Sequence, residues 1–115
     1  MAVTPSEKRV AFHALHRQGC FVIPNPWDVG SAIALEALGF KALASTSAGF
    51  AWSRGLPDGA VTRDEVLMHL SELAAAVEVP VNADFEGAFA VKPEEVAANV
   101  KLAVETGIAG LSVED

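Results

Sequence analysis

Oxygen-bearing side chains occur where the short apolar runs of this sequence end. Asn82 and Asp84 lie at the end of the run at 79–83, and Glu114 follows the run at 110–113. The two-residue period of a strand places Asn82 and Asp84 on one side of it. If that side and the side of Glu114 point inward, the two carboxylates converge from neighbouring strands. Two carboxylates in a largely apolar interior are unfavourable unless a proton, a base or a metal ion compensates their charge.

A divalent cation is the compensation that these groups favour. No Lys or Arg lies at the strand ends, and an oxygen-only set of carboxylate, amide and hydroxyl groups favours Mg²⁺ or Mn²⁺ over Zn²⁺. The simpler alternative is that Asp84 and Glu114 are solvated at an open sheet edge. His13, His16 and His69 lie away from the strand ends and are expected to be surface or packing residues, not ligands.

A polar segment follows the apolar run at 42–45. Thr46-Ser47-Ala48-Gly49 is either an ordinary polar turn or a nest of N–H and hydroxyl groups for a carboxylate or a phosphate, and composition favours neither. Trp27 and Trp52 stand in loops near the same mouth, where they form an apolar wall for a site or pack against the fold. Asp28 is typical of a helix N-cap.

Strands alternating with helices would position these groups. Buried strands are expected at four apolar runs bounded by Gly or Pro signals, which are Cys20–Ile23, Ala42–Ser45, Val79–Ala83 and Gly110–Val113. A first helix is expected over Ser6–Gln18, and a longer loop over Thr46–Val61. Three further helices are expected. One begins at Asp28 or Ser31 and ends at Gly39, one begins at the capping box Thr62–Glu65, and one begins at Pro93 and ends at Gly107.

This order implies parallel strands joined by right-handed crossovers. Two α/β architectures remain, a small open doubly wound sheet and one half of a (β/α)8 barrel. The sequence stops at Asp115, directly after an apolar strand, with no helix to cover that strand. We therefore expect residues 1–115 to be the N-terminal half of a single (β/α)8 barrel domain, with an N-terminal helix and about four βα units, truncated after the fourth strand.

Composition argues against several classes of protein. The chain is 51% apolar with a formal net charge of −7 and no basic patch, which disfavours intrinsic disorder and nucleic-acid binding. No stretch approaches the ~18 apolar residues of a membrane span, and no secretory signal precedes the first helix. Cys20 is the only cysteine and is expected to be a small buried hydrophobe. We expect a cytoplasmic protein that binds neither nucleic acid nor membrane.

Four segments give the chain a resemblance to the phosphoenolpyruvate mutase/isocitrate lyase superfamily. In this order and spacing they are Asn25-Pro26-Trp27-Asp28, Ser45-Thr46-Ser47-Ala48-Gly49 with Gly55-Leu56-Pro57-Asp58, Asn82-Ala83-Asp84-Phe85-Glu86-Gly87, and Val113-Glu114-Asp115. The resemblance implies a (β/α)8 barrel that assembles as dimers or tetramers. It also implies chemistry next to a carboxylate, through an enolate of a 2-oxo acid held on Mg²⁺, with Mn²⁺ as a possible replacement.

The resemblance also implies roles for individual residues. It assigns Asn82, Asp84 and Glu114 to the metal, and Asp58 to the metal's water shell, with Asp58 and Glu114 as the catalytic acids. Ser45, Thr46 and Ser47 match the loop that binds the substrate carboxylate. Trp27 is expected to be a further substrate contact, as an apolar wall of the site. Asn82 departs from the family pattern, which has Asp there, so one negative charge is lost. Either Glu86 makes up this charge, or Asp84 becomes the direct metal ligand.

The implied activity is that of a lyase for carbon–carbon bonds, of the isocitrate or 2-methylisocitrate lyase type. The family's Lys-x-Cys-Gly loop, which distinguishes lyases from other members, would lie beyond Asp115. Phosphoenolpyruvate or phosphonopyruvate mutase, hydrolase and oxaloacetate decarboxylase activities therefore stay open, and this chain alone is expected to be inactive. Two other classes remain: a non-catalytic half-barrel that associates with a partner chain, and a small α/β module that binds an anionic metabolite at 46–49 without metal.

Overall fold

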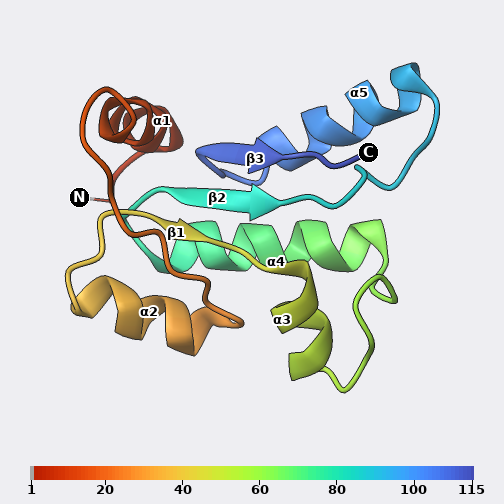
Figure 1. Ribbon diagram of the computed structural model, residues 1–115, viewed down its shortest axis with the longest axis horizontal. Helices are drawn as coiled ribbons and strands as arrows, with labels where there is room; N and C mark the ends of the chain where they lie inside the picture. Colours follow the sequence, from red (N-terminus) through yellow and green to blue (C-terminus); the bar gives the residue numbers. More distant parts are fainter. Residues whose placement is uncertain (1) are drawn as a thin grey trace.

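The computed structural model describes residues 2–115, which form five helices around a three-stranded parallel sheet of order β1-β2-β3. In chain order the elements are α1 (Pro5–Leu15), α2 (Val29–Ala37), β1 (Leu43–Ala44), α3 (Ser47–Ser53), α4 (Arg63–Ala76), β2 (Val81–Asp84), α5 (Pro93–Val104) and β3 (Gly110–Ser112). Helix α1 lies at the N-terminal ends of the strands, while α3 and the segment after β2 lie at their C-terminal ends (Figure 1). Within residues 2–115, no helix has both the length and the apolar character needed to cross a membrane.

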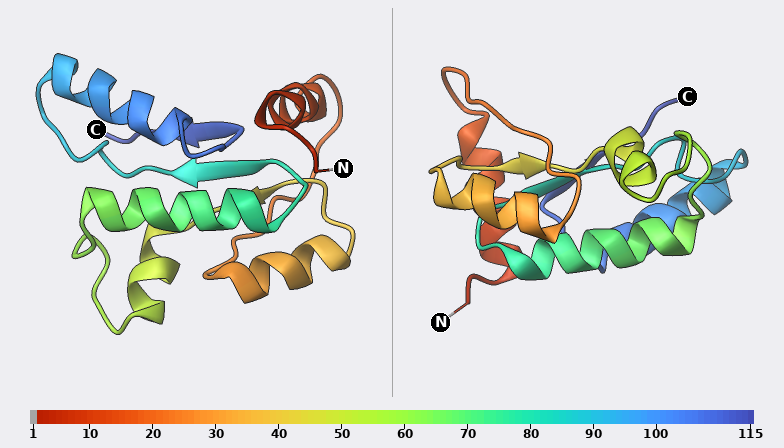
Figure 2. Two further views of the ribbon diagram at one scale, coloured as in Figure 1. Left: turned by 180° about the vertical axis from the view of Figure 1, so that it is seen from behind. Right: turned by 90° about the horizontal axis from the view of Figure 1, so that it is seen from below.

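The helices flank the sheet on one side, which distinguishes the two expected architectures. Helices α2, α4 and α5 lie on the same side of the strands, and over residues 2–115 no helix is laid against the opposite face (Figure 2). A doubly wound sheet carries helices on both faces, whereas a (β/α)8 barrel carries all of them outside its strands. The sequential strand order without a reversal also fits the barrel. The expected half-barrel architecture is therefore confirmed.

The two faces of β2 differ as the strand period predicts. Val81, Ala83 and the following Phe85 are buried against the helices, whereas Asn82 and Asp84 are only half-buried on the opposite face. That opposite face corresponds to the interior of the barrel. Parallel pairing with β3 sets Asp84 beside Ser112, so the polar face of β2 continues onto the next strand. The apolar faces thus build the core while the polar faces meet at the strand ends.

Local signals positioned the predicted helices correctly. The Asp28 carboxylate accepts a hydrogen bond from the Ser31 N–H at 2.8 Å, so Asp28 is the N-cap of α2. Thr62 caps α4 in the same way, and Pro93 occupies the first turn of α5. Gly39 follows α2 with a φ of +97°, a conformation that glycine adopts without steric cost. These four signals depend only on neighbouring residues, which is why the sequence sufficed to find them.

The strand predicted at Cys20–Ile23 is wrong. The segment runs beside β1 without forming a ladder, and its backbone contact with β1 is one hydrogen bond from the Ala44 N–H to the Pro24 carbonyl. Pro24 and Pro26 have no N–H to donate, so a regular ladder cannot continue through them. Cys20 is exposed instead of buried for the same reason, because no strand carries it into the core.

The long loop predicted at Thr46–Val61 is also partly wrong, because it contains helix α3. The Thr46 hydroxyl accepts a hydrogen bond from the Gly49 N–H at 3.1 Å and caps this helix. Gly49 is required here by close packing: a Cβ on it would lie 2.4 Å from the Trp27 ring. The contact with Trp27 is long-range in sequence, so the local pattern of small residues did not reveal the helix.

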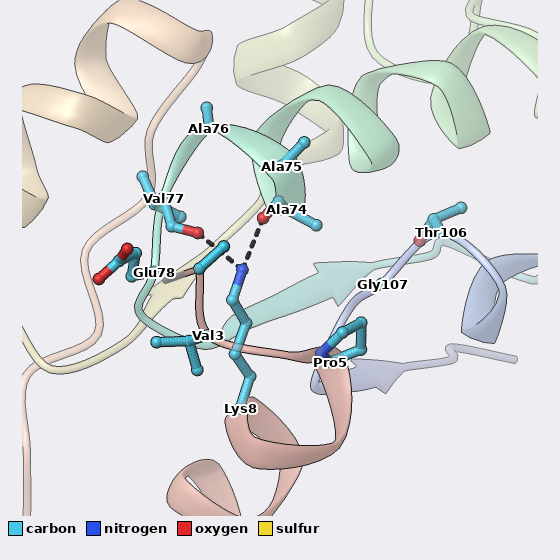
Figure 3. A pocket seen from close by; sticks show the side chains of 11 residues that line it. Val3, Pro5, Lys8, Ala74, Ala75, Ala76, Val77, Glu78, Thr106 and Gly107 are labelled. Carbon is cyan, nitrogen blue, oxygen red and sulfur yellow. Dashed lines mark hydrogen bonds between the residues drawn. The ribbon is translucent and has the colours of Figure 1, made fainter.

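Helix α1 closes the N-terminal end of the half-barrel through two adjacent basic side chains. The Lys8 ammonium donates to the carbonyls of Ala74 and Val77, both at 2.6 Å, at the end of α4 (Figure 3). The Arg9 guanidinium donates to the Val104 carbonyl at the end of α5 and to the Ile108 carbonyl. Helix C-termini carry unpaired carbonyls and partial negative charge, which both cations satisfy. Lys8 also lines a cavity of about 400 Å³. Its ammonium group is already paired there with the carbonyls of Ala74 and Val77.

Replacing Lys8 by methionine should lower the free energy of unfolding by about 2 kcal/mol, because it leaves two buried carbonyls without a donor. Burial already lowers the pKa of Lys8, while Glu36 and Glu78 raise it in part. Urea denaturation monitored by circular dichroism measures the change. Lys41→Met is the matched control, since Lys41 is exposed. Equal stability of the two variants would contradict the capping role.

Candidate active site

An acidic cavity of about 330 Å³ opens at the C-terminal ends of the strands. Three successive connections contribute to it: Ser47 and Asp58 follow β1, Glu86 follows β2, and Glu114 follows β3. The lining residues are Ser47, Asp58, Gly59, Glu86, Gly87, Glu114 and Asp115. This lining holds four carboxylates and no basic side chain, so the cavity suits a cation or a cation-bound ligand. Ligands of parallel α/β sheets bind at this end of the strands.

Asp84, at the end of β2, is hydrogen-bonded to the residues that follow β1. Its carboxylate accepts a hydrogen bond from the Ser47 N–H at 2.9 Å, and its own N–H donates to the Ser45 hydroxyl at 2.9 Å. The Glu86 N–H lies 3.4 Å from the other carboxylate oxygen. Asp84 does not line the cavity itself, but these contacts hold its carboxylate in one orientation beside Ser47 and Glu86, which do. Each carboxylate oxygen retains lone pairs for a further partner.

Glu86 is the residue through which the other acids meet. Burial raises the pKa of its carboxyl, and the nearby charges of Asp58, Asp84 and Glu114 raise it further. Its carbonyl accepts a hydrogen bond from the Glu114 N–H at 2.7 Å, which ties the ends of β2 and β3 together. Sequence analysis named Glu86 only as a replacement for the charge lost at Asn82. The structure shows that it lines the cavity itself.

The backbone around Glu86 adopts an unusual conformation. Glu86, Ala88 and Phe89 have φ values of +51°, +60° and +58°, in the left-handed region that favours glycine. Each non-glycine residue there costs about 1–2 kcal/mol relative to the right-handed conformation. Such strain persists only where the surrounding structure enforces it, and it often accompanies functional sites.

The donor set fits a magnesium ion that keeps part of its hydration shell. Among residues 2–115, no three His, Cys, Asp or Glu side chains lie close enough to hold an ion by direct contacts alone. Mg²⁺ does not require such a cage, because it retains several waters and is usually bound by one or two carboxylates and by its substrate. The neighbouring carboxylates that raise the pKa of Glu86 are the kind of uncompensated charge that a cation relieves.

The hydroxyl residues after β1 already have structural partners. Ser45 is buried and accepts from Asp84, and Thr46 accepts from Gly49, so Ser47 is the member of this group that lines the cavity. A hydroxyl that accepts a hydrogen bond still has its own O–H to donate. The roles predicted for Ser45, Thr46 and Ser47 as contacts for a substrate carboxylate stay predictions.

Two further predicted site residues, Trp27 and Asn82, do not line the cavity either. Trp27 packs its ring on Gly49 and contacts Trp52 edge-to-face, with 5.8 Å between ring centroids. Asn82 lies one step deeper than Asp84 on the same face of β2, and its side-chain oxygen faces the start of β3, 2.9 Å from where a Cβ on Gly110 would lie. The roles predicted for both residues toward a ligand stay predictions.

Comparison with known proteins shows the family to which the chain is similar. The family model described as phosphoenolpyruvate phosphomutase matches residues 12–115. An uncharacterized protein of Mycobacterium tuberculosis is 37% identical over 92% of this chain, and a 2-methylisocitrate lyase of Halalkalibacterium halodurans is 32% identical over 96% of it. These matches cover 40% and 38% of the relatives. The chain thus spans about two fifths of the length of the curated relatives.

Solved structures give the same result at the level of the fold. A lyase/mutase candidate from Burkholderia cenocepacia matches with a TM-score of 0.94 and 49% identity, over 96% of this chain and 40% of that chain. Oxaloacetate acetylhydrolase in complex with oxalate matches with a TM-score of 0.84 and 30% identity, over 97% of this chain and 39% of that chain. The half-barrel seen here is therefore the arrangement that these proteins share.

Proposed function

The chain belongs to the phosphoenolpyruvate phosphomutase family, and from that membership we propose that residues 1–115 form the N-terminal half of a magnesium-dependent (β/α)8-barrel enzyme. The observation that carries the proposal is the acidic cavity at the strand ends, which has four carboxylates and no basic residue in its lining. The positive groups that a carboxylate substrate needs would come from Mg²⁺ and from the remaining half of the barrel.

The proposed substrate is a small 2-oxo acid or a related carboxylate, and the proposed reaction is cleavage of a carbon–carbon bond beside the carboxylate. The similarity to a 2-methylisocitrate lyase and to structures of 2,3-dimethylmalate lyase supports this choice. Phosphoenolpyruvate or phosphonopyruvate chemistry and oxaloacetate decarboxylation are the alternatives. The similarity to oxaloacetate acetylhydrolase keeps hydrolysis among them.

Within this chain, Asp84 and Glu114 would hold Mg²⁺ with part of its water shell, Asn82 would contribute its amide oxygen, and Asp58 would accept hydrogen bonds from metal-bound water. When bound, Mg²⁺ supplies a Lewis acid that stabilises negative charge developing on the substrate. The Ser47 N–H is committed to Asp84, so its hydroxyl is the group left for the substrate carboxylate. The proposed catalytic acids are Asp58 and Glu114.

The direct test is an activity assay of the intact polypeptide purified from its native source. Release of a 2-oxo acid from 2-methylisocitrate or 2,3-dimethylmalate is measured with Mg²⁺ and after removal of metal by EDTA. We expect turnover that EDTA abolishes and Mg²⁺ or Mn²⁺ restores. Turnover of phosphonopyruvate or oxaloacetate alone would favour the alternatives, and full activity in EDTA would contradict the metal-dependent proposal.

A non-catalytic half-barrel that associates with a partner is the second candidate function. It is favoured by a largely apolar cavity of about 550 Å³ beside the end of β3, where Val91 is 96% exposed and Val113 is 44% exposed. Intact mass of the native protein separates the two candidates. A mass well above 12.0 kDa supports the enzyme, which we propose to be a homodimer or homotetramer, whereas a mass of 12.0 kDa supports the associating half-barrel.

Replacing Asn82 by aspartate should tighten Mg²⁺ binding by about tenfold, because it adds one negative charge on the inner face of β2 beside Asp84. Isothermal titration of the wild-type and N82D proteins with Mg²⁺ measures the difference. Gln18→Glu is a control that adds a charge at an exposed loop position after α1. If N82D binds Mg²⁺ no more tightly than Gln18→Glu does, Asn82 is not a ligand.

A further inference from the structure

The loop after β2 depends on one buried contact from outside the cavity. The carbonyl of Ala88, a residue with no exposed surface, accepts a hydrogen bond at 2.7 Å from the side-chain amide of Asn99 on α5. Ala88 and its neighbour Phe89 have left-handed backbone conformations. A buried carbonyl without a donor is strongly unfavourable. Asn99 is therefore the group that makes this loop conformation compatible with burial.

The orientation of the Asn99 amide is determined by its two partners. Asn99 is 7% exposed, and its side-chain oxygen accepts from the Arg63 guanidinium at 3.0 Å at the start of α4. A guanidinium can only donate and a carbonyl can only accept, so the amide nitrogen must face Ala88 and the oxygen must face Arg63. The residue thus links α4, α5 and the loop in one arrangement.

The same loop carries one acidic residue of the cavity, Glu86, and is hydrogen-bonded to the segment that carries another, Glu114. The Glu86 carbonyl accepts from the Glu114 N–H at 2.7 Å, and the Glu86 N–H approaches the Asp84 carboxylate at 3.4 Å. A rotation of the loop at Ala88 would move Glu86, and with it the hydrogen bond that positions Glu114. Asn99 itself does not line the cavity. Its influence on the site must therefore pass through the backbone of residues 86–89.

We propose that Asn99 is a positioning residue that holds the loop at 86–89, in which Glu86, Ala88 and Phe89 are left-handed, and thereby directs Glu86 and Glu114 toward the proposed metal-binding cavity. The inference rests on the proposed function for the identity of the ligand. It goes beyond it by assigning a role to a buried helix residue that has no contact with the cavity. A purely structural role would instead consist of linking α4 to α5 through Arg63.

Three variants separate the two roles. Asn99→Asp keeps an acceptor for Arg63 but replaces the donor to Ala88 by a carboxylate oxygen. Asn99→Leu removes both hydrogen bonds at similar volume. Arg63→Met keeps the donor to Ala88 and removes the link to α4. Asn99→Asp is the decisive variant, because it preserves the link between the helices and breaks the link to the loop.

Two readouts on the intact protein are compared. Hydrogen–deuterium exchange of the Ala88 and Glu114 amides reports the loop, since their partners are the carbonyls of Phe85 and Glu86. Direct titration with Mn²⁺ measures the metal affinity of the cavity. A general loss of stability would not change this affinity in the folded fraction. In Asn99→Asp we expect exchange about tenfold faster at these amides and Mn²⁺ affinity about tenfold weaker. Arg63→Met should stay within about threefold of wild type in both.

Failure of this inference and failure of the proposed function give different results. If wild type binds Mn²⁺ but Asn99→Asp leaves both readouts unchanged, or Arg63→Met changes them equally, the positioning role is overturned. If wild type binds no Mn²⁺, the proposed function fails, and exchange at Ala88 and Glu114 alone decides whether Asn99 holds the loop. If Asn99→Leu does not fold, Asn99→Asp still provides the comparison.

Discussion

Replacing Asp84 by alanine is expected to reduce metal-dependent turnover by at least about a hundredfold while the chain keeps its fold. The reason is geometric: the Asp84 carboxylate accepts a hydrogen bond from the Ser47 N–H after β1, and the Asp84 backbone N–H donates to the Ser45 hydroxyl. Its removal takes away a proposed metal ligand and the acceptor that orients Ser47. The measurement is the rate of 2-oxo acid release against Mg²⁺ concentration, with circular dichroism to confirm folding.

Asp84→Asn is the matched variant for this experiment. It retains an oxygen that can accept from the Ser47 N–H but lacks the negative charge. If Asp84 acts through its charge on the metal, Asp84→Asn should be nearly as inactive as Asp84→Ala, and added Mg²⁺ should restore its turnover only in part. If Asp84 serves only to orient Ser47, Asn should behave as wild type. Activity of Asp84→Ala within tenfold of wild type would exclude the proposed metal site.

Acidification between pH 6.5 and pH 4 is expected to lower the free energy of unfolding by about 2 to 3 kcal/mol through His69 alone. The imidazole is 6% exposed and stacks on Phe50, with 3.8 Å between ring centroids, and its Nε2 has no hydrogen-bond partner within residues 2–115. Burial lowers the pKa of His69 to about 4, against a smaller raising effect of Asp28. The figure of about 2 to 3 kcal/mol is below the free energy that the whole pKa shift corresponds to, because solvent screens the outer edge of the ring.

The sign of this dependence follows from the order of protonation. Because the pKa is lower in the folded state than the ordinary 6.5, the unfolded chain takes up the proton first as the pH falls. The full contribution is therefore present above pH 6.5 and is lost by about pH 4. Urea denaturation at a series of pH values measures it. His69→Phe keeps the stack on Phe50 and cannot titrate, so its difference from wild type isolates the histidine; an unchanged difference across this range would contradict the assignment.

Protonation of His69 should also destabilise the candidate site, because Phe50, on which His69 stacks, belongs to α3. The first residue of that helix is Ser47, whose N–H holds Asp84. Protonation of His69 places a charge under α3 in a position where Nε2 has no acceptor among the residues described. His69 was expected to be a surface or packing residue, and the structure shows that it is buried and packs on Phe50.

Sequence alone was sufficient wherever the deciding interaction is local. The caps at Asp28 and Thr62 and the proline that opens α5 act through hydrogen bonds or backbone angles within one turn of a helix. The opposite faces of β2 follow from the strand period, which also placed Asn82 and Asp84 together. The alternation of these elements implied parallel strands, and parallel strands gather their C-terminal residues at one end.

Sequence reasoning failed for one strand and one helix. The segment at Cys20–Ile23 has an apolar composition typical of a strand, but the prolines after it remove the donors that a ladder with β1 would need. Helix α3 was missed because its short sequence is stabilised by the contact of Gly49 with Trp27 and by the stack of Phe50 on His69. Both contacts join residues about twenty apart.

The functional site divides in the same way. The residue types and their positions after the strands specify an oxygen-rich site at one end of the sheet, because side-chain chemistry and strand period are properties of the sequence. Tertiary structure alone decided three other features of the site. Glu86 lies near the other acidic residues, Trp27 packs on α3, and the Asn99 amide donates to the carbonyl of Ala88 in the loop after β2. These three features arise from packing between separate elements, and packing depends on distances that no local pattern encodes.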